Sequence, residues 1–493
     1  MSSVRSAPEP PPSALPRTVM AVRVRAAATT PSPSMTTAPA RALPLRPPAR
    51  TLPEHVTRTI ALALPVMCGR AGLLMMFTVA LVMVGHAGPN DQAYFAAGFA
   101  PHMLVLIFGM GLVASVTVLS AQADGAGNAV QCGRIWRLGL LLAVACGGAG
   151  AIAMLWGRDI LYLAGQDEDI ALHGGAVILM FAPGMPAALM FVATTAFLES
   201  IGRPRPGMTV SLAANVMNLL LCWVFVFGKF GLPAMGAPGA ALAISITRWF
   251  MVAAITGYAL ALPQHEHYGV RGALAGHYRM FVKLLRVGTP LALAMGMESV
   301  AFTATTMFAG WLGNDALAAY QDAINVNAFV FMLALGLQTA TSVRVANAVG
   351  RNDQTGMRVA GWVGAGINIG LLAAVAVVIW FSRDVLATVF TDNPAVHAVL
   401  ASALGVVAII SICDGLQAVL IGATRGVADT VVPTVLQGVA FWVIMVPLNL
   451  YLSGPAGFGI DGLFYGIGIS VAAASLFLAV RFALVTQRHI RPV

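Results

Sequence analysis

Long apolar runs, separated by short clusters of Gly, Pro and charged residues, follow one another along most of the chain. Many of them reach the roughly 18–25 residues that an α-helix needs to cross a bilayer. The runs are continuously apolar rather than alternating, so membrane-spanning β-strands are not expected. The pattern predicts an all-α integral membrane protein with twelve transmembrane helices, at residues 60–86, 93–121, 135–156, 170–198, 208–228, 236–262, 285–312, 316–343, 359–381, 396–423, 433–453 and 459–481.

The composition supports this interpretation. Of the 493 residues, 58% are hydrophobic and only 10% are charged, whereas soluble domains carry about 25% charged residues. We therefore expect no nucleic-acid partner, although the formal net charge is +9. The cysteines are odd in number and scattered, without a CxxC pair, which supports neither a disulfide framework nor a metal site; they are Cys68, Cys132, Cys146, Cys222 and Cys413.

The first fifty or so residues are rich in Pro, Ala, Ser, Thr and Arg. They lack the apolar core of a secretory signal peptide. We expect residues 1–57 to form a disordered cytoplasmic tail, or to include an over-extended start with Met20 or Met35 as the first residue. An organellar transit peptide is the alternative, because the segment is rich in Arg and poor in acids.

Basic residues concentrate on alternate loops. With the N-terminus inside, the outer loops hold only Arg158, Lys229 and Arg383, while the remaining loops and both tails hold nearly all the others, including Arg344 and Arg425. This is the positive-inside bias of a correct topology. It predicts a multi-pass protein of the bacterial inner membrane with both termini in the cytoplasm.

The two halves of the chain repeat each other at an offset close to 225 residues. The matched pairs are Pro65 and Pro290, Phe77 and Phe302, Gly85 and Gly310, Gly88 and Gly313, Gly111 and Gly336, Ala121 and Ala346, and Gly125 and Gly350. Because each half has six spans, the repeats are parallel and enclose a cavity between two lobes. The expected organisation is a tail (1–57), an N-terminal lobe (58–262), a cytoplasmic linker (263–284), a C-terminal lobe (285–482) and a second tail (483–493).

Several segments carry a resemblance to a known family. They include VMVGHAG (82–88), FLESIGRPRPG (197–207), GMESVAFTATTMFAGWLG (296–313), LAAYQDAINVN (317–327) and CDGLQAVLIGATRGVADT (413–430). In order and spacing they resemble the multidrug and toxic compound extrusion (MATE) transporters. The resemblance implies a twelve-helix, two-lobe antiporter. We also expect a monomer without enzyme activity or cofactor. It would export drug-like, lipophilic or cationic small molecules through a cavity with alternating access, in exchange for Na⁺ or H⁺.

Few ionisable residues lie well inside the predicted helices, and a charge at bilayer depth usually marks an ion or substrate pathway. Glu298 lies mid-helix, and its repeat counterpart is Leu73. Asp414 has Gln417 one turn further along its helix. The resemblance gives Glu298 and Asp414 the role of a cation site. Asp322 and Asn325 are further candidates on the neighbouring helix. Such oxygen ligands suit Na⁺, the one metal ion expected; a desolvated carboxylate can instead carry a proton.

The N-terminal lobe departs from the family pattern. Many bacterial members carry an aspartate where this chain has Ala80, and some place a second one where Cys222 stands. We therefore expect coupling through the C-terminal lobe alone, with Na⁺ favoured over H⁺. The polar candidates that remain in this lobe are Asn215, Asn218 and Gln122.

Other residues within the spans are assigned mainly to architecture. Pro65, Pro183 and Pro290 are candidates for helix kinks or gating. His86 and His102 are expected to be structural or interfacial. Arg70 lies near enough to the helix end to snorkel, and Arg248 is expected to pair with a backbone carbonyl or an acid.

The sequence does not favour other classes of function. ATP-driven transport by this chain, zinc hydrolysis and serine hydrolysis lack their motifs, and the loops lack the Asp/His clusters of a membrane enzyme. A lipid-linked precursor flippase would need several Arg or Lys in the cavity, where only Arg70 and Arg248 lie deep in the predicted spans. A major facilitator transporter also has six plus six spans, but the loop at 123–134 lacks its GxxxDRxGRR pattern.

Overall fold

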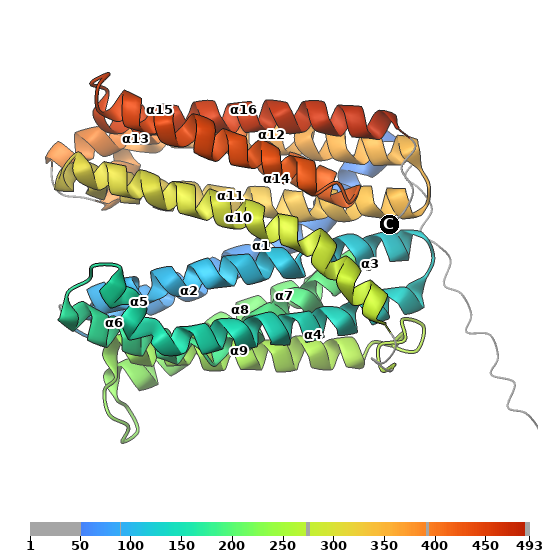
Figure 1. Ribbon diagram of the computed structural model, residues 1–493, viewed down its shortest axis with the longest axis horizontal. Coiled ribbons are helices and arrows are strands. Elements are labelled where there is room, and N and C mark those ends of the chain that lie inside the picture. Colours follow the sequence, from blue (N-terminus) through green and yellow to red (C-terminus); the bar gives the residue numbers. More distant parts are fainter. Residues whose placement is uncertain (1–50, 89, 273–276, 391–393, 489–493) are drawn as a thin grey trace, which may run out of the picture. The chain divides into compact units, whose positions relative to one another are not determined.

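The computed structural model describes residues 51–88, 90–272, 277–390 and 394–488, so most of the predicted N-terminal tail lies outside the described residues. The described part is helical throughout, without a strand (Figure 1). The helices are α1 (Leu52–Gly85), α2 (Asp91–Val113), α3 (Ser115–Gly125), α4 (Ala129–Ala153), α5 (Gly157–Leu163), α6 (Glu168–Phe181), α7 (Gly184–Ser200), α8 (Arg205–Phe227), α9 (Gly236–Leu260), α10 (Tyr278–Trp311), α11 (Asn314–Gly350), α12 (Gln354–Phe390), α13 (Pro394–Gly426), α14 (Val431–Gly438), α15 (Val446–Ser453) and α16 (Gly459–Gln487), with the 3₁₀ turn η1 (Met154–Trp156) and the π-helical η2 (Val439–Met445).

Among the described residues, 11 helical stretches are long and apolar enough to cross a membrane, or 12 when α6 and α7 count as one broken span. The predicted all-α, twelve-helix membrane fold is confirmed. The helices run past the apolar stretches, however: α11 ends at Gly350 rather than 343, and α13 at Gly426 rather than 423. Arg344 and Arg425, which were predicted in loops, therefore lie inside helices. Their charged ends interact with other parts of the bundle, Arg344 with the carbonyl of His55 and Arg425 with Glu298.

Local chemistry sets several helix ends. The Thr51 side chain accepts a hydrogen bond from the backbone N–H of Glu54 at 3.5 Å and caps α1. Gly228 ends α8 in the left-handed region at φ 65°, which costs a residue without Cβ little. Pro183 lies at the break where α7 turns by 44° from α6, whereas Pro65 and Pro290 lie within the continuous helices α1 and α10.

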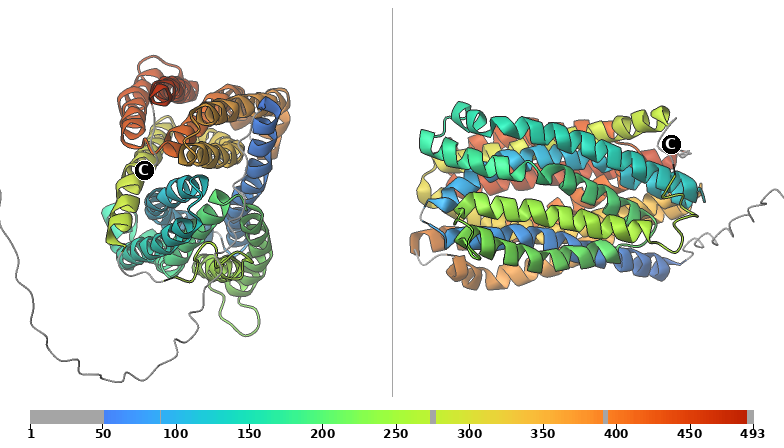
Figure 2. Two further views of the ribbon diagram at one scale, coloured as in Figure 1. Left: turned by 90° about the vertical axis from the view of Figure 1, so that its right-hand side faces the viewer. Right: turned by 90° about the horizontal axis from the view of Figure 1, so that it is seen from below.

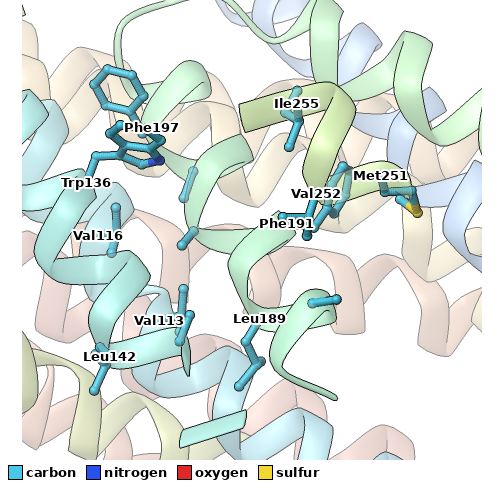
Figure 3. Close-up of a cluster of buried hydrophobic side chains, with 14 of the residues drawn as sticks. Val113, Val116, Trp136, Leu142, Leu189, Phe191, Phe197, Met251, Val252 and Ile255 are labelled. Carbon is cyan, nitrogen blue, oxygen red and sulfur yellow. The ribbon is translucent and has the colours of Figure 1, made fainter. Parts of the chain in front are cut away.

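The helices gather into two groups, α1 to α9 and α10 to α16, seen end-on in Figure 2. Each group has an apolar core, and α10 contributes to both, with Leu284 and Leu291 in the first and Ala301 and Phe308 in the second. In the first, shown in Figure 3, Trp136 stacks on Phe197 with ring centroids 5.5 Å apart and donates to the Thr194 hydroxyl at 3.2 Å. In the second, Tyr320 packs on Phe464 at 5.5 Å. We call these groups the N-lobe and the C-lobe.

Matched glycines join the two lobes in a symmetrical way. A Cβ on Gly111 of α2 would overlap the backbone of Ala292 in α10, and one on Gly336 of α11 would overlap Met67 in α1. Gly111 and Gly336 are 225 residues apart, and so are Met67 and Ala292. The two contacts are therefore the same contact made twice, once from each repeat.

A second pair of contacts obeys the same rule. Gly125 of α3 lies against the carbonyl of Asn347 in α11, and Gly350 lies against the carbonyl of Gln122 in α3. Gln122 and Asn347 are again 225 residues apart. A parallel repeat related by an axis along the bundle accounts for both pairs.

The lobes are also hydrogen-bonded at this end of the bundle, where α1 begins and α11 and α13 finish. We call it the basic end, after Arg203 and Arg205 in the connection at 201–205 and Arg351 in the connection at 351–354. The Gln122 amide donates to the carbonyl of Gly426 at 3.1 Å. Arg344 donates to the carbonyl of His55 at 2.6 Å and to the hydroxyl of Thr59.

We expect the substitution Gly111→Ala to destabilise the protein by about 1–3 kcal/mol, because the added methyl group overpacks the α2–α10 contact. Gly148→Ala in α4 is the matched control, since nothing lies within 4 Å of the Cβ it would add. Thermal unfolding in detergent measures both. Equal melting temperatures for the two variants would contradict the close packing of the lobes at Gly111.

Candidate functional site

Glu298 lies in α10 and is half-buried. The charged groups that act on it electrostatically are Asp414 and Arg425, both from α13. The structure thus brings together the two carboxylates that the sequence singled out, from helices more than a hundred residues apart. Two acids and one guanidinium share this region of the C-lobe.

Asp414 is only 6% exposed. Its carboxylate accepts a hydrogen bond from the Asn327 amide of α11 at 3.4 Å. The Ser411 hydroxyl, one turn before Asp414, lies 3.0 Å from the Asn327 oxygen and orients this amide. A carboxylate with one amide donor keeps acceptor sites free for a further partner.

Buried amide oxygens surround the same stretch of α13. Asn368 of α12 packs against Gly415, where any larger residue would meet its amide group. Both amide atoms of Asn368 and the oxygen of Gln417 are buried and have no hydrogen-bond partner within the described part of the chain. Since buried polar atoms are rarely left unpaired, these oxygens fit a site for a small cation or water beside Asp414.

Arg425 is a residue of this site that the sequence interpretation missed by placing it in a loop. It interacts electrostatically with Glu298, and its Nε is buried. A signal existed in the spacing: eleven residues separate Asp414 from Arg425, about three helical turns, which places both on one face. The helix end had to be known before that spacing could be used.

The two candidates on α11 are placed differently. Asn325 is exposed and Asp322 is half-buried, and the structure brings neither side chain to Asp414. The amide that reaches Asp414 belongs to Asn327, two residues beyond Asn325. Two residues turn a helix by about 200°, so Asn325 and Asn327 point to nearly opposite sides.

The polar N-lobe candidates connect helices to one another. Asn215 and Asn218 of α8 donate to the carbonyls of Gly72 and Met76 in α1, at 2.8 and 3.1 Å. Their amide oxygens are buried and have no hydrogen-bond partner among the described residues. Gln122, by contrast, lies at the basic end between the lobes.

The positions of the missing N-lobe acids are filled by apolar packing. Ala80 and Cys222 are both fully buried in one core cluster with Met76 and Val226. An aspartate at either position would place a carboxylate among apolar side chains. A buried acid that the sequence interpretation overlooked is Glu199 of α7, which is 6% exposed and interacts electrostatically with Arg70.

Comparison with known proteins agrees with this architecture. The MatE family model matches residues 65–224 and 290–451, one segment in each lobe. The chain is 30% identical over 448 residues to the probable multidrug resistance protein NorM of Bradyrhizobium diazoefficiens, covering 90% of this chain and 96% of the relative. It is 32% identical over 440 residues to the corresponding protein of Rhodopseudomonas palustris, with 88% and 92% covered.

Solved structures share the fold. A eukaryotic MATE transporter, AtDTX14, superposes with a TM-score of 0.81 at 21% identity, covering 88% of this chain and 96% of that one. The outward-facing conformation of a multidrug resistance MATE transporter gives 0.80 at 18% identity, with the same coverage. With a model match over both lobes and relatives along most of its length, the chain belongs to the MatE family.

Proposed function

We propose that the protein is a secondary active multidrug efflux transporter of the bacterial inner membrane. It exports lipophilic or cationic compounds in exchange for a cation by alternating access. The NorM relatives, named as multidrug resistance proteins, support the substrate class. The observation that carries the coupling mechanism is the carboxylate pair of Glu298 and Asp414, held in the C-lobe beside Asn327.

The pair couples the two fluxes through its charge. Two carboxylates in an apolar bundle repel each other, and Arg425 balances only one of them. Binding of one cation neutralises the remaining charge and allows α10 and α13 to approach. Because such a ligand favours one lobe arrangement over the other, its binding shifts the equilibrium between the two openings of the cavity.

The hydrogen bonds between the lobes at the basic end support an outward-facing conformation. The positive-inside bias assigns that end to the cytoplasm. Arg344 and Gln122 then close the cytoplasmic side in this conformation. These hydrogen bonds must break for the cytoplasmic side to open. Substrate would enter from the cytoplasm after they break.

Sodium is the coupling ion that we favour. The oxygens of Asn368 and Gln417 are buried beside Asp414 and lack donors in the described chain. A cation that binds oxygen ligands satisfies them together with the carboxylate, whereas a proton on the carboxylate satisfies only one acceptor.

We expect Glu298→Gln to reduce gradient-driven dye efflux from proteoliposomes roughly tenfold or more. The amide keeps the size of the side chain but removes the charge that a cation would neutralise. The control is Asp384→Asn, an exposed acid at the far end of α12, which should transport as the wild type does. Unaltered efflux by Glu298→Gln would reject Glu298 as a coupling residue.

Substrate-triggered dequenching of a pH dye inside vesicles distinguishes coupling to Na⁺ from coupling to H⁺. For a sodium-coupled transporter, substrate efflux should follow an imposed Na⁺ gradient and leave the pH signal unchanged. A pH change that accompanies transport equally with and without Na⁺ would instead assign the coupling to protons, while leaving the carboxylate pair as its carrier.

We expect Asn327→Leu to raise the half-saturating Na⁺ concentration about tenfold, because residues that orient a metal-binding carboxylate contribute 10–100-fold to affinity. Asn325→Leu, with its exposed side chain, should have a smaller effect. Na⁺-dependent dye efflux measures both variants. The reverse order of effects would assign the amide ligand to Asn325.

A further inference from the structure

The N-lobe contains a second buried polar cluster, which plays no part in the cation mechanism. His102 of α2 is 0% exposed and Arg248 of α9 is 4% exposed. Arg248 lies twelve residues from either end of α9 (Gly236–Leu260), at mid-depth of the bundle. A charged residue at that depth is costly and usually functional.

The contact between the two side chains fixes their protonation. Arg248 Nη2 lies 3.1 Å from His102 Nε2. A guanidinium only donates hydrogen bonds, so this imidazole nitrogen must accept. His102 is therefore neutral with its proton on Nδ1. Both Nδ1 of His102 and Nη1 of Arg248 are buried and have no partner within the described residues.

Aromatic rings, rather than a carboxylate, surround the positive charge. Phe181 stacks on His102 with ring centroids 4.2 Å apart. The guanidinium carbon of Arg248 lies 5.8 Å from the centre of the Phe77 ring and 5.9 Å from that of Phe181. The salt bridges among the described residues do not include Arg248. Cation–π contacts offset part of the free-energy cost of burying the guanidinium. They do not neutralise its charge, and they leave Nη1 of Arg248 and Nδ1 of His102 without acceptors in the described part of the chain.

The cluster adjoins the broken span. The break between α6 and α7 leaves carbonyls without helical partners, and two residues of α9 near Arg248 in sequence bind them. Ser245 donates to the carbonyl of Met180 at 2.7 Å, and Trp249 donates to that of Pro183 at 2.9 Å. Discontinuous helices at mid-membrane are a common feature of ligand sites in transporters.

The repeat gives this position a counterpart. His102 plus 225 is Asn327, the residue whose amide contacts Asp414 in the C-lobe. At this matched position, the N-lobe residue contacts an arginine, whereas the C-lobe residue contacts a carboxylate. The broken span is specific to the N-lobe, since its counterpart α13 is continuous.

We propose that Arg248 and His102 form an anion-binding site in the N-lobe. The ligand is a small anionic group, either a free chloride ion or the carboxylate of an aromatic substrate. Such a group accepts hydrogen bonds from Nη1 and Nδ1 and compensates the buried charge, as a bidentate arginine partner does. The rings of Phe77 and Phe181 supply apolar contacts for the aromatic part of a substrate.

The test is thermal unfolding of the purified full-length protein in detergent at constant Na⁺. Chloride, benzoate and the neutral benzamide are titrated against the bulky hydrophilic anion gluconate. The wild type should be stabilised by chloride, by benzoate or by both, and not by benzamide. Stabilisation by chloride would identify the ligand of the site as a free anion. Stabilisation by benzoate alone would identify it as the carboxylate of a substrate.

We expect Arg248→Met to raise the half-saturating anion concentration about tenfold or more, as the loss of a charge-assisted hydrogen bond implies. His102→Asn keeps a polar side chain and should weaken binding less. The control is Arg158→Gln, an exposed arginine of α5, which should behave as the wild type does. Absence of anion-specific stabilisation in the wild type overturns the proposal even where a variant does not fold, and so does equal stabilisation of a folded Arg248→Met protein.

Discussion

Inside a membrane-spanning helix bundle, a polar side chain has no bulk water to satisfy it, and every other feature of this protein follows from that constraint. A buried donor or acceptor must find a partner in the protein or in a ligand. Most intrahelical hydroxyls here solve the problem locally, as Thr305 does by donating to the carbonyl four residues earlier. Other buried polar groups are not satisfied in this way, and among them those around Asp414 in one lobe and Arg248 in the other are the places where we propose a ligand.

In the proposed alternating-access mechanism, the contact between the lobes has to be both tight and reversible. Glycines at 111, 125, 336 and 350 bring backbones together without interlocking side chains. Helices that meet in this way gain van der Waals contact over a smooth surface, which allows one lobe to rock against the other. The polar contacts of Arg344 with α1 add specificity to the closed side, and a few hydrogen bonds of this kind cost little to exchange for water when that side opens.

The fold could be predicted from the sequence because its signals are long-range averages: apolar runs, basic loops and a constant repeat offset. The rotation of each helix about its own axis, which decides which side chains face the site, could not be predicted. Asn325 and Asn327 are equally plausible ligands until the rotation of α11 is known, and only then does Asn327 reach Asp414. Arg425 was predicted in a loop because the apolar run ends at residue 423, whereas helix α13 continues to Gly426. His102 was classed as structural because its partner, Arg248, is 146 residues away.

The two lobes share one backbone plan but carry opposite internal charges, and this asymmetry has a consequence for transport. In the proposed mechanism, a cation entering between the lobes would be attracted by Glu298 and Asp414 and so directed to the C-lobe. An anionic group is directed the other way. A substrate with a cationic and an anionic end would then compete with the coupling ion only through its cationic end. In that case the cationic end would compete for the C-lobe carboxylates while the anionic end stays bound in the N-lobe.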